Sequence, residues 1–336
     1  MMIISLTLLI TLLSTISGCL QQEETPEDNN HNNTIPVNEN STIYVGSIYA
    51  DYSTIQEAIN AAKNDDTIIV QKGSYNELIT MNKTITLIGE DKNTTIINFN
   101  PNYAISQVPI VNINADNCSI ENLHITLSDN SVIAQGISIN SKNNIIKNNI
   151  ITKVANGIAL SVYSESNTII NNQIKNNLIG ILTSGSMNNN ISNNIFSDNT
   201  QYSIYLSIDS DKNNVSFNIM NNSQYGIRVK GAHYNKVYKN CIKNNDVGIY
   251  CCCGAESNYF YNNTLVNNSL RNAYEYSDLF NIWYDYTSSN GNYWDNYTGS
   301  DENHDGIGDT PYKIPDAGNQ DSYPLMTPPL DVPCNQ

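Results

Sequence analysis

Residues 144–172 read NIIKNNIITKVANGIALSVYSESNTIINN and contain one complete period of a repeat that decides the fold. Each period has an Asn, an apolar residue two positions later, and a second Asn five positions after the first. The first Asn recurs every 22 to 24 residues, at Asn144, Asn167, Asn189, Asn213, Asn235 and Asn258, and the second at Asn149, Asn172, Asn194, Asn218, Asn240 and Asn263. Asn117 and Asn122 begin the pattern one irregular turn earlier. Such a period is typical of a solenoid, in which each repeat forms one turn.

Three short strands are predicted in each turn. The first follows a Gly-Ile pair, as at Gly157-Ile158, and the other two follow the two Asn residues. Asn suits the bends because it tolerates left-handed backbone angles and hydrogen-bonds its own loop. Identical Asn side chains that stack at the strand spacing of about 4.8 Å also form amide ladders. We therefore expect an all-β, single-stranded parallel β-helix in which the Asn columns are structural.

The start of the chain predicts export. Residues 1–18 are apolar and uncharged, and Ile16-Ser17-Gly18-Cys19 is similar to a lipobox. We expect a signal peptide over 1–18 that is removed and a lipidated Cys19. A retained membrane anchor is the alternative, because the usual Lys or Arg near the start is absent. Residues 19–42 are polar, acidic and aperiodic, so they predict a disordered tether.

The charge balance excludes one class of partner. The chain has 16 Lys and Arg against 32 Asp and Glu, a formal net charge of −16. Arg228 and Arg271 are its only arginines. Without a basic surface to neutralise phosphates, the protein is not expected to bind nucleic acid.

We assign residues 43–298 to the β-helix with its two caps. Ser53-Thr54-Ile55-Gln56 is a capping-box pattern, and Ile55, Ala58, Ile59 and Ala62 then share one helical face. A helix here would cover the first turn, whose hydrophobic end and strand edges need protection. Aromatic residues crowd the other end between Tyr274 and Tyr297, which favours an aromatic cap over a ligand platform.

Two segments carry a family resemblance. Residues 51–90, DYSTIQEAINAAKNDDTIIVQKGSYNELITMNKTITLIGE, resemble the opening of right-handed parallel β-helix proteins of the pectin-lyase superfamily. Residues 291–326, GNYWDNYTGSDENHDGIGDTPYKIPDAGNQDSYPLM, resemble the end of NosD-type β-helix proteins, whose domain is described as carbohydrate-binding and sugar-hydrolase-like. The resemblance covers roughly residues 43–326. It implies the right-handed fold and two activities, carbohydrate recognition and assembly of a copper centre outside the cytoplasm.

Equivalent positions of successive turns form columns, so a site can combine residues that are distant in sequence. One outward column contains Asp211, His233 and Glu256, the catalytic candidates, and another contains Tyr205, Arg228 and Tyr250, the candidate sugar-binding residues. Aromatic rings stack on sugars and charged groups hold hydroxyls or uronates, while paired carboxylates can cleave a glycosidic bond. A solvated mixed-charge face is the alternative. The residue sets that pectate lyases and polygalacturonases use are missing here, so we do not expect an efficient enzyme.

The cysteines and the acidic tail suggest metals. Cys251, Cys252 and Cys253 are consecutive, and strand alternation sends Cys251 to the core and Cys252 to the other face. Packing and soft-metal or redox chemistry are both open for them, with copper as the metal, and an even number of remaining cysteines permits disulfides without assigning them. In the tail, residues 299–336, a calcium-loop pattern falls on Asp301, Asn303, Asp305, Ile307 and Asp309. Tyr312 occupies the position of the usual bidentate Glu, so a plain acidic turn is the alternative.

The sequence as a whole predicts an envelope-anchored β-helix protein of the cell surface or periplasm. We expect it to recognise or scaffold a polysaccharide or surface glycan and to reach the membrane through its lipid anchor. A NosD-like copper-centre assembly factor and a polysaccharide lyase or hydrolase are the two alternatives.

Overall fold

The computed structural model describes residues 40–99, 106–128, 133–276, 280–316, 318–332 and 334. Residues 40–336 form one compact unit, separate from residues 1–39. The predicted signal peptide, Cys19 and most of the tether lie outside the described residues and stay predictions. Within the described part, no helix is long and apolar enough to cross a membrane.

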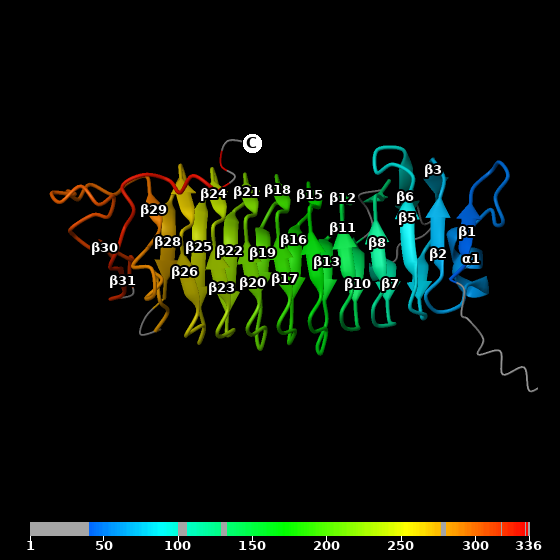
Figure 1. Cartoon of the computed structure of the whole chain (residues 1–336), viewed down its shortest axis with the longest axis horizontal. Coiled ribbons are helices and arrows are strands. Elements are labelled where there is room, and N and C mark those ends of the chain that lie inside the picture. Colours follow the sequence, from blue (N-terminus) through cyan, green and yellow to red (C-terminus); the bar gives the residue numbers. More distant parts are fainter. Residues whose placement is uncertain are drawn as a thin grey trace, which may run out of the picture. The chain divides into compact units, whose positions relative to one another are not determined.

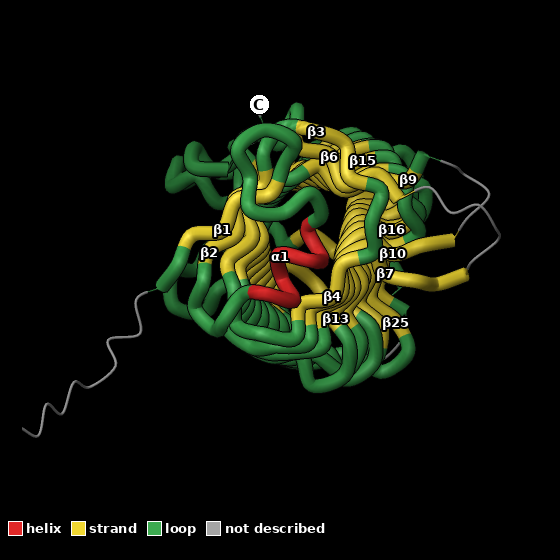
Figure 2. The backbone as a smooth tube through the Cα atoms, turned by 90° about the vertical axis from the view of Figure 1, so that its right-hand side faces the viewer, coloured by secondary structure: helices red, strands yellow, loops and turns green. Residues whose placement is uncertain are grey.

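Residues 40–336 fold as a right-handed parallel β-helix, which confirms the predicted fold class (Figure 1). Three parallel sheets run along the axis, and the view down the axis shows them on three sides of the coil (Figure 2). Sheet 1 contains β1 (Thr42–Val45), β2 (Thr67–Val70), β5 (Thr86–Gly89), β8 (Ser119–Glu121), β11 (Ile145–Lys147), β14 (Thr168–Ile170), β17 (Asn190–Ser192), β20 (Asn214–Ser216), β23 (Lys236–Tyr238) and β26 (Tyr259–Tyr261).

Sheet 2 contains β3 (Gly73–Tyr75), β6 (Thr95–Phe99), β9 (His124–Leu127), β12 (Ile150–Thr152), β15 (Gln173–Lys175), β18 (Ile195–Ser197), β21 (Ile219–Asn221), β24 (Cys241–Lys243), β27 (Thr264–Val266) and β29 (Tyr293–Trp294). Sheet 3 contains β4 (Ile79–Met81), β7 (Ser106–Ile113), β10 (Ile133–Ile139), β13 (Asn156–Leu160), β16 (Ile179–Thr183), β19 (Tyr202–Leu206), β22 (Tyr225–Lys230), β25 (Val247–Cys252) and β28 (Arg271–Glu275). A short antiparallel pair, β30 (Tyr312–Lys313) and β31 (Gln320–Asp321), follows the coil.

The core is a stack of apolar layers, one for each turn. A turn passes from sheet 3 to sheet 1 and then to sheet 2, and it places apolar residues such as Ile158, Ile169 and Ile174 inside, where all three are fully buried. Strand alternation sends the intervening side chains outward. The outer face of each sheet therefore displays columns of residues that are one turn apart in sequence.

Two Asn ladders fasten successive turns together inside the bends. Both the backbone N–H and the side-chain Nδ2 of Asn144 donate to Oδ1 of Asn167, each at 2.9 Å. The same pairing continues rung by rung through both predicted columns, and it extends past the sequence repeat to Asn281 and Asn292. Because these amides are fully buried, each ladder satisfies polar groups that would otherwise destabilise the core.

The left-handed backbone position lies one residue before each ladder Asn, not on the ladder Asn itself. Lys212, Phe217 and Tyr234 occupy this position with φ of 57°, 55° and 57°. Asn117 and Asn122 also have positive φ, and the ladder positions that follow them hold Cys118 and Leu123. The expectation that Asn117 and Asn122 begin the ladder is therefore wrong by one residue. The ladders begin at Asn144 and Asn149, whose Oδ1 atoms accept the N–H groups of Cys118 and Leu123.

The first turn is covered by a helix, as the sequence predicts. Helix α1 (Ile55–Ala61) lies across the open end of the coil in Figure 2 and buries Ile55, Ala58 and Ile59. Its N-cap is Thr54, whose side chain accepts the N–H of Glu57, so the capping box starts one residue later than Ser53.

The last turn ends in buried carboxylates. Asn281 closes the first ladder by donating to Glu275 at 2.6 Å, and Asn292 closes the second by donating its backbone N–H to Asp321 at 2.7 Å. Both carboxylates are fully buried. Four rings cover this end, with centroid distances of 4.4, 5.9 and 4.1 Å along the series Phe260, Trp283, Trp294 and Tyr312.

A C-terminal strap, residues 326–332 and 334, runs back over sheet 2 (Figure 1). A disulfide joins Cys334 to Cys241 on β24, and Lys239 pairs with Asp331 at 2.6 Å. Val332 packs against Ile219 in a small apolar cluster. The strap thus covers an outward apolar patch on sheet 2.

Candidate functional site

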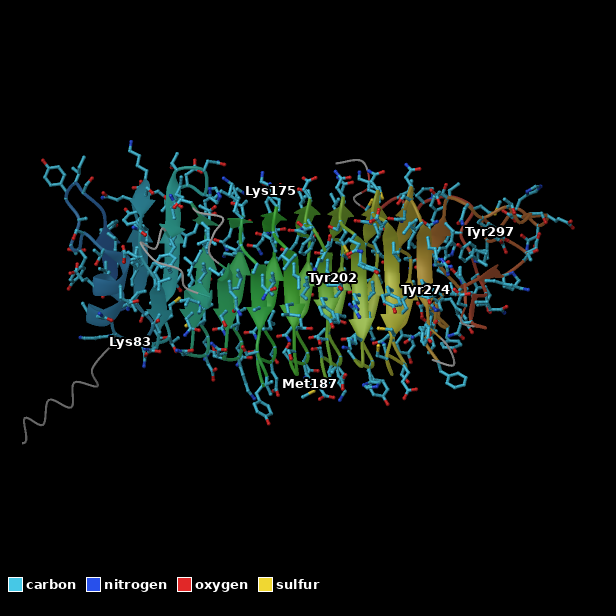
Figure 3. The ribbon with its side chains drawn as sticks, turned by 180° about the vertical axis from the view of Figure 1, so that it is seen from behind. Lys83, Lys175, Met187, Tyr202, Tyr274 and Tyr297 are labelled. Atoms are coloured by element: carbon cyan, nitrogen blue, oxygen red, sulfur yellow. A yellow bond between two sulfur atoms is a disulfide. The ribbon has the colours of Figure 1, made fainter. Side chains whose placement is uncertain are left out.

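The outer face of sheet 3 carries the predicted sugar-binding residues. Tyr205 on β19, Arg228 on β22 and Tyr250 on β25 are direct partners in the strand register, and Tyr274 on β28 follows. We call these four residues, with Tyr202 and Tyr225, the tyrosine–arginine face. Figure 3 shows Tyr202 and Tyr274 on the side of the coil, along the strands of sheet 3.

Arg228 lies at the centre of this face. Its guanidinium carbon is 5.4, 5.1 and 5.5 Å from the ring centroids of Tyr202, Tyr205 and Tyr250, within the range of cation–π attraction. Nη1 donates to the Tyr202 hydroxyl at 2.6 Å, and Nη2 contacts Sγ of Cys252 at 3.8 Å. The buried Nε has no hydrogen-bond partner. These contacts hold the guanidinium in place and leave part of its donor capacity unused.

The positive charge of Arg228 has no acidic partner in the described part of the chain. Among the described residues, no carboxylate lies within ion-pair distance of Arg228, whereas Arg271 pairs with Asp316. Burial by itself lowers the pKa of Arg228, but its hydrogen bonds to Cys252 and Tyr202 raise that pKa above its ordinary value. The side chain is therefore a permanent, partly desolvated cation on a protein of net charge −16, and such a group attracts an anion or an oxygen-rich ligand.

The tyrosines form a stack along the coil axis. Ring centroids are 5.3 Å apart for Tyr202 and Tyr225, 5.6 Å for Tyr225 and Tyr250, and 5.1 Å for Tyr250 and Tyr274. The ring planes of the last two pairs are nearly parallel, with interplanar angles of 25° and 12°. Because stacked rings cover each other's faces, the inner tyrosines offer ring edges and hydroxyl groups to a ligand. Sequence reasoning missed Tyr202 and Tyr225, although each directly precedes the small residue of a Ser-Ile or Gly-Ile pair and strand alternation places it outward.

Asp211, His233 and Glu256 lie elsewhere, in the bends between sheet 3 and sheet 1. Asp211 accepts the backbone N–H of His233 at 2.7 Å, and its Oδ1 is 3.4 Å from Nδ1 of the imidazole. Glu256 is exposed on the next turn. Met187, from the same column, lies at the lower edge of the coil in Figure 3, away from Tyr202 and Tyr274. The structure therefore brings Asp211 and His233 together but separates this column from the tyrosine–arginine face.

The three consecutive cysteines point in different directions. Cys251 is in the core beside Glu275, where burial and then the nearby carboxylate hold the pKa of its thiol well above the ordinary value. Cys252 is buried on the outer side next to Arg228, and Cys253 is exposed in the following turn. Sγ of Cys253 lies 3.0 Å from Sγ of Cys252. The structure thus forms a pair of thiols and leaves Cys251 out of it.

In the acidic loop of the tail, the carboxylates accept hydrogen bonds from backbone N–H groups of the same loop. Asp301 accepts the N–H groups of Asp305 and Gly306 at 3.1 and 3.0 Å, and Asp309 accepts that of Glu302 at 2.8 Å. Asn303 Oδ1 accepts the same Asp305 N–H, at 3.0 Å. In the described part of the chain, no three Asp, Glu, His or Cys side chains converge as the ligands of one metal ion do.

A family model described as "Periplasmic copper-binding protein (NosD)" matches residues 88–299, which is more than half of the chain. A comparison with curated proteins found no match. Among solved structures, the pectate lyase Pel9A is similar with 14% sequence identity and a TM-score of 0.54, over 78% of this chain and 82% of that one.

XylC in complex with xylose is similar with 13% identity and a TM-score of 0.52, over 67% of this chain and 69% of that one. At these identities the likeness shows the shared β-helix fold alone.

Proposed function

The chain belongs to the NosD family, described as periplasmic copper-binding proteins, and from its surface geometry we propose that it is an exported β-helix protein that binds carbohydrate. The binding surface would be the tyrosine–arginine face of sheet 3. The lipobox-like segment before Cys19 supports a lipid anchor that would hold this face outside the membrane, where surface glycans and polysaccharides are found.

The position of Arg228 is the observation that carries the proposal. A guanidinium that has no acidic partner among the described residues and is held between tyrosines on an outer sheet face is a charged group for ligand oxygens to approach. Neighbouring tyrosine hydroxyls add donors and acceptors along the same line. Sugar hydroxyl and uronate groups match this arrangement, because they supply many oxygens along an extended chain. The structural neighbours include a pectate lyase and a protein with bound xylose, so the fold is compatible with such ligands.

Binding of a polysaccharide panel to the full chain tests the proposal. Arg228→Gln should weaken retention of the bound polymer about tenfold or more, because it removes a charge-assisted hydrogen bond. The matched control is Tyr261→Ala. It removes one ring of a similar stacked pair, Tyr238 and Tyr261, whose centroids are 5.2 Å apart on the outer face of sheet 1. Equal losses in the two variants, or no polymer bound by the natural protein, would contradict a specific site on sheet 3.

The same panel tests for catalysis. Mass spectrometry would detect released oligosaccharides, and their appearance would direct attention to Asp211 and His233, which already share a contact. Replacing Asp211, His233 and Glu256 together should then abolish the release. Release that survives the triple replacement would exclude this column as the active site.

Copper handling is the second candidate, favoured by the family match and by the Cys252–Cys253 pair. Thiolate sulfur is a suitable ligand for Cu(I), and these two thiols would hold the ion, with Cys251 excluded by its inward position. A competition titration with a Cu(I) chelator should show one bound ion that is lost in Cys252→Ser and kept in Cys251→Ser. A titration in which neither thiol is protected from alkylation would remove this candidate.

We also propose that calcium stiffens the acidic loop around Asp301, Asp305 and Asp309. Carboxylate and carbonyl oxygens suit calcium, and their mutual repulsion would fall on binding. Chelation should then lower the melting temperature of the natural protein and leave that of Asp301→Asn unchanged. A melting temperature that is insensitive to both calcium and chelator would make the loop a plain acidic turn.

A further inference from the structure

The adjacent thiols of Cys252 and Cys253 have a defined geometry. Their sulfurs are 3.0 Å apart, about one ångström more than the S–S bond of a disulfide. Cys253 is exposed in a turn, with φ of 59°, and Gly254 follows with φ of 85°. Cys252 is 1% exposed. The Cys253 thiol can therefore react with a reagent from solution, and the buried Cys252 thiol lies next to it.

The surroundings of the pair separate it from the other free thiols. The guanidinium Nη2 of Arg228 lies 3.8 Å from Sγ of Cys252. Cys118 and Cys251 are buried without such a cation, and burial is the largest cause that raises the pKa of each thiol. The hydrogen bond to Cys252 and then burial raise the pKa of the Cys253 thiol as well, so access to solvent and the adjacent sulfur are what separate the pair from the other described free cysteines.

We propose that Cys252 and Cys253 form a site of thiol–disulfide exchange, in which Cys253 is the attacking thiol and Cys252 the resolving thiol. The oxidant would be a small organic disulfide. The inference is independent of carbohydrate binding, because it concerns the state of the two sulfurs and not the ligand of the sheet.

The exchange proceeds in two balanced steps. Cys253 gives its proton to water, its Sγ attacks one sulfur of the disulfide, and the first thiolate leaves and takes that proton back from water. Cys252 then gives up a proton and attacks Sγ of Cys253, and the second thiolate leaves and accepts that proton. The two cysteines are oxidised to one vicinal disulfide, and the small disulfide is reduced to two thiols.

Glutathione disulfide is a suitable probe on the folded full chain. After brief mild reduction and a timed reaction, remaining thiols are alkylated, and the tryptic peptide of residues 244–271, which contains all three cysteines, is weighed. In the natural protein this peptide should change from three alkylated cysteines to one, with the loss of two hydrogens and no retained glutathione. A glutathione adduct that persists on the natural peptide would overturn the proposal without any variant.

Variants assign the two roles. Cys252→Ser should stop at a stable glutathione adduct on Cys253, and the peptide of Cys253→Ser should react at least tenfold more slowly, because its two remaining thiols, Cys251 and Cys252, are buried. Cys251→Ser, the matched control, should close its disulfide like the natural protein. Rapid reaction in Cys253→Ser would overturn the assigned order.

Discussion

At the scale of single residues, the ladder asparagines are required for their amide groups and not for their backbone angles. Phe, Tyr and Lys all occupy the left-handed positions that precede the ladder, so the bend accepts many side chains despite a cost of about 1 kcal/mol each. The ladder Asn cannot be replaced in the same way, because its Oδ1 accepts two donors of the turn before it. Oδ1 of Asn213, for example, accepts both the N–H and the Nδ2 of Asn189.

Asn213→Ala should therefore destabilise the protein strongly. It removes the acceptor of the Asn189 N–H and of one Nδ2 hydrogen in a fully buried site, while Nδ2 keeps its bond to the carbonyl of Ser164, and the expected loss is about 3 kcal/mol of the free energy of unfolding. Lys212→Asn, one residue earlier at φ of 57°, is the matched control. It should leave the stability unchanged or raise it by up to about 1 kcal/mol. Denaturant unfolding of both variants measures the difference, and a larger loss for Lys212→Asn would contradict the role given to the amide.

Asp321 should make stability depend on pH. Burial raises the pKa of this carboxyl to about 6, although hydrogen bonds from Asn292, Trp294 and Tyr323 partly oppose the shift. The folded protein therefore keeps a proton that the unfolded chain releases near pH 4. As the pH rises from about 4 to about 6, this site should reduce the free energy of unfolding by about 3 kcal/mol, and above that window its effect should be constant.

Asp321→Asn isolates this contribution because an amide does not titrate. Urea unfolding of both proteins between pH 4 and pH 7 gives a difference curve, in which the natural protein should lose stability relative to the variant as the pH rises. A flat difference curve would mean that the folded carboxyl has an ordinary pKa.

At the scale of elements, the C-terminal strap is the part that depends most on covalent chemistry. It has no strand pairing to the coil among the described residues. Its attachment includes the Cys241–Cys334 disulfide, the Lys239–Asp331 ion pair, the packing of Val332 and a hydrogen bond of 2.8 Å from Lys243 to the carbonyl of Cys334. An exposed ion pair contributes little on its own. The disulfide therefore decides whether sheet 2 stays covered.

Cys334→Ser should release the strap without unfolding the coil. The bond closes a loop with a sequence separation of 93 residues, and the chain-entropy model gives about 4 kcal/mol for a loop of that length. The melting temperature should fall. A protease should cut within the released strap, while the coil stays resistant to cleavage. Limited proteolysis with mass spectrometry distinguishes this result from general unfolding. Unchanged protection of the strap would show that packing alone holds it.

The same scale shows what sequence reasoning could and could not find. The period predicted the strands, the core columns and the placement of Tyr205, Arg228 and Tyr250 on adjacent strands. In a solenoid, residues that are one period apart in sequence lie side by side on adjacent strands. It did not predict the contact of Cys252 with Arg228 or the roles of Glu275 and Asp321. Those features depend on side-chain direction and on an irregular tail that closes over the last turns, and neither repeats in the sequence. The ladder register was misplaced at Asn117 and Asn122 because Asn occurs both at the left-handed position and at the ladder position.

At the scale of the whole described coil, the ladders have a direction. Along each ladder, Nδ2 of each Asn donates to Oδ1 of the Asn in the next turn, and in most rungs the same Nδ2 also donates to a backbone carbonyl of the turn before. Each row therefore begins with an oxygen that accepts a backbone N–H and ends with an Asn whose N–H groups need an acceptor. A carboxylate supplies that acceptor in both ladders, at Glu275 and at Asp321. A third, shorter row of Asn245, Asn268 and Asn272 ends on the exposed Asp295, through a hydrogen bond of 2.7 Å from Asn272. Negative charge at the donor end matches the summed amide dipoles, by the same physics that favours acids at the start of a helix.

Glu275→Ala should therefore loosen the coil from its C-terminal end. The change leaves the amide of Asn281 and the indole N–H of Trp283 without their acceptor, at a cost of about 1–3 kcal/mol for each buried donor. In a solenoid each turn contacts only its neighbours, so the loss should stay local and spread by fraying. Hydrogen exchange should show faster exchange over β25 to β29, while the turns next to α1 keep their protection. A uniform rise in exchange along all three sheets would instead show that the coil unfolds as one unit and that the ladder ends have no special role.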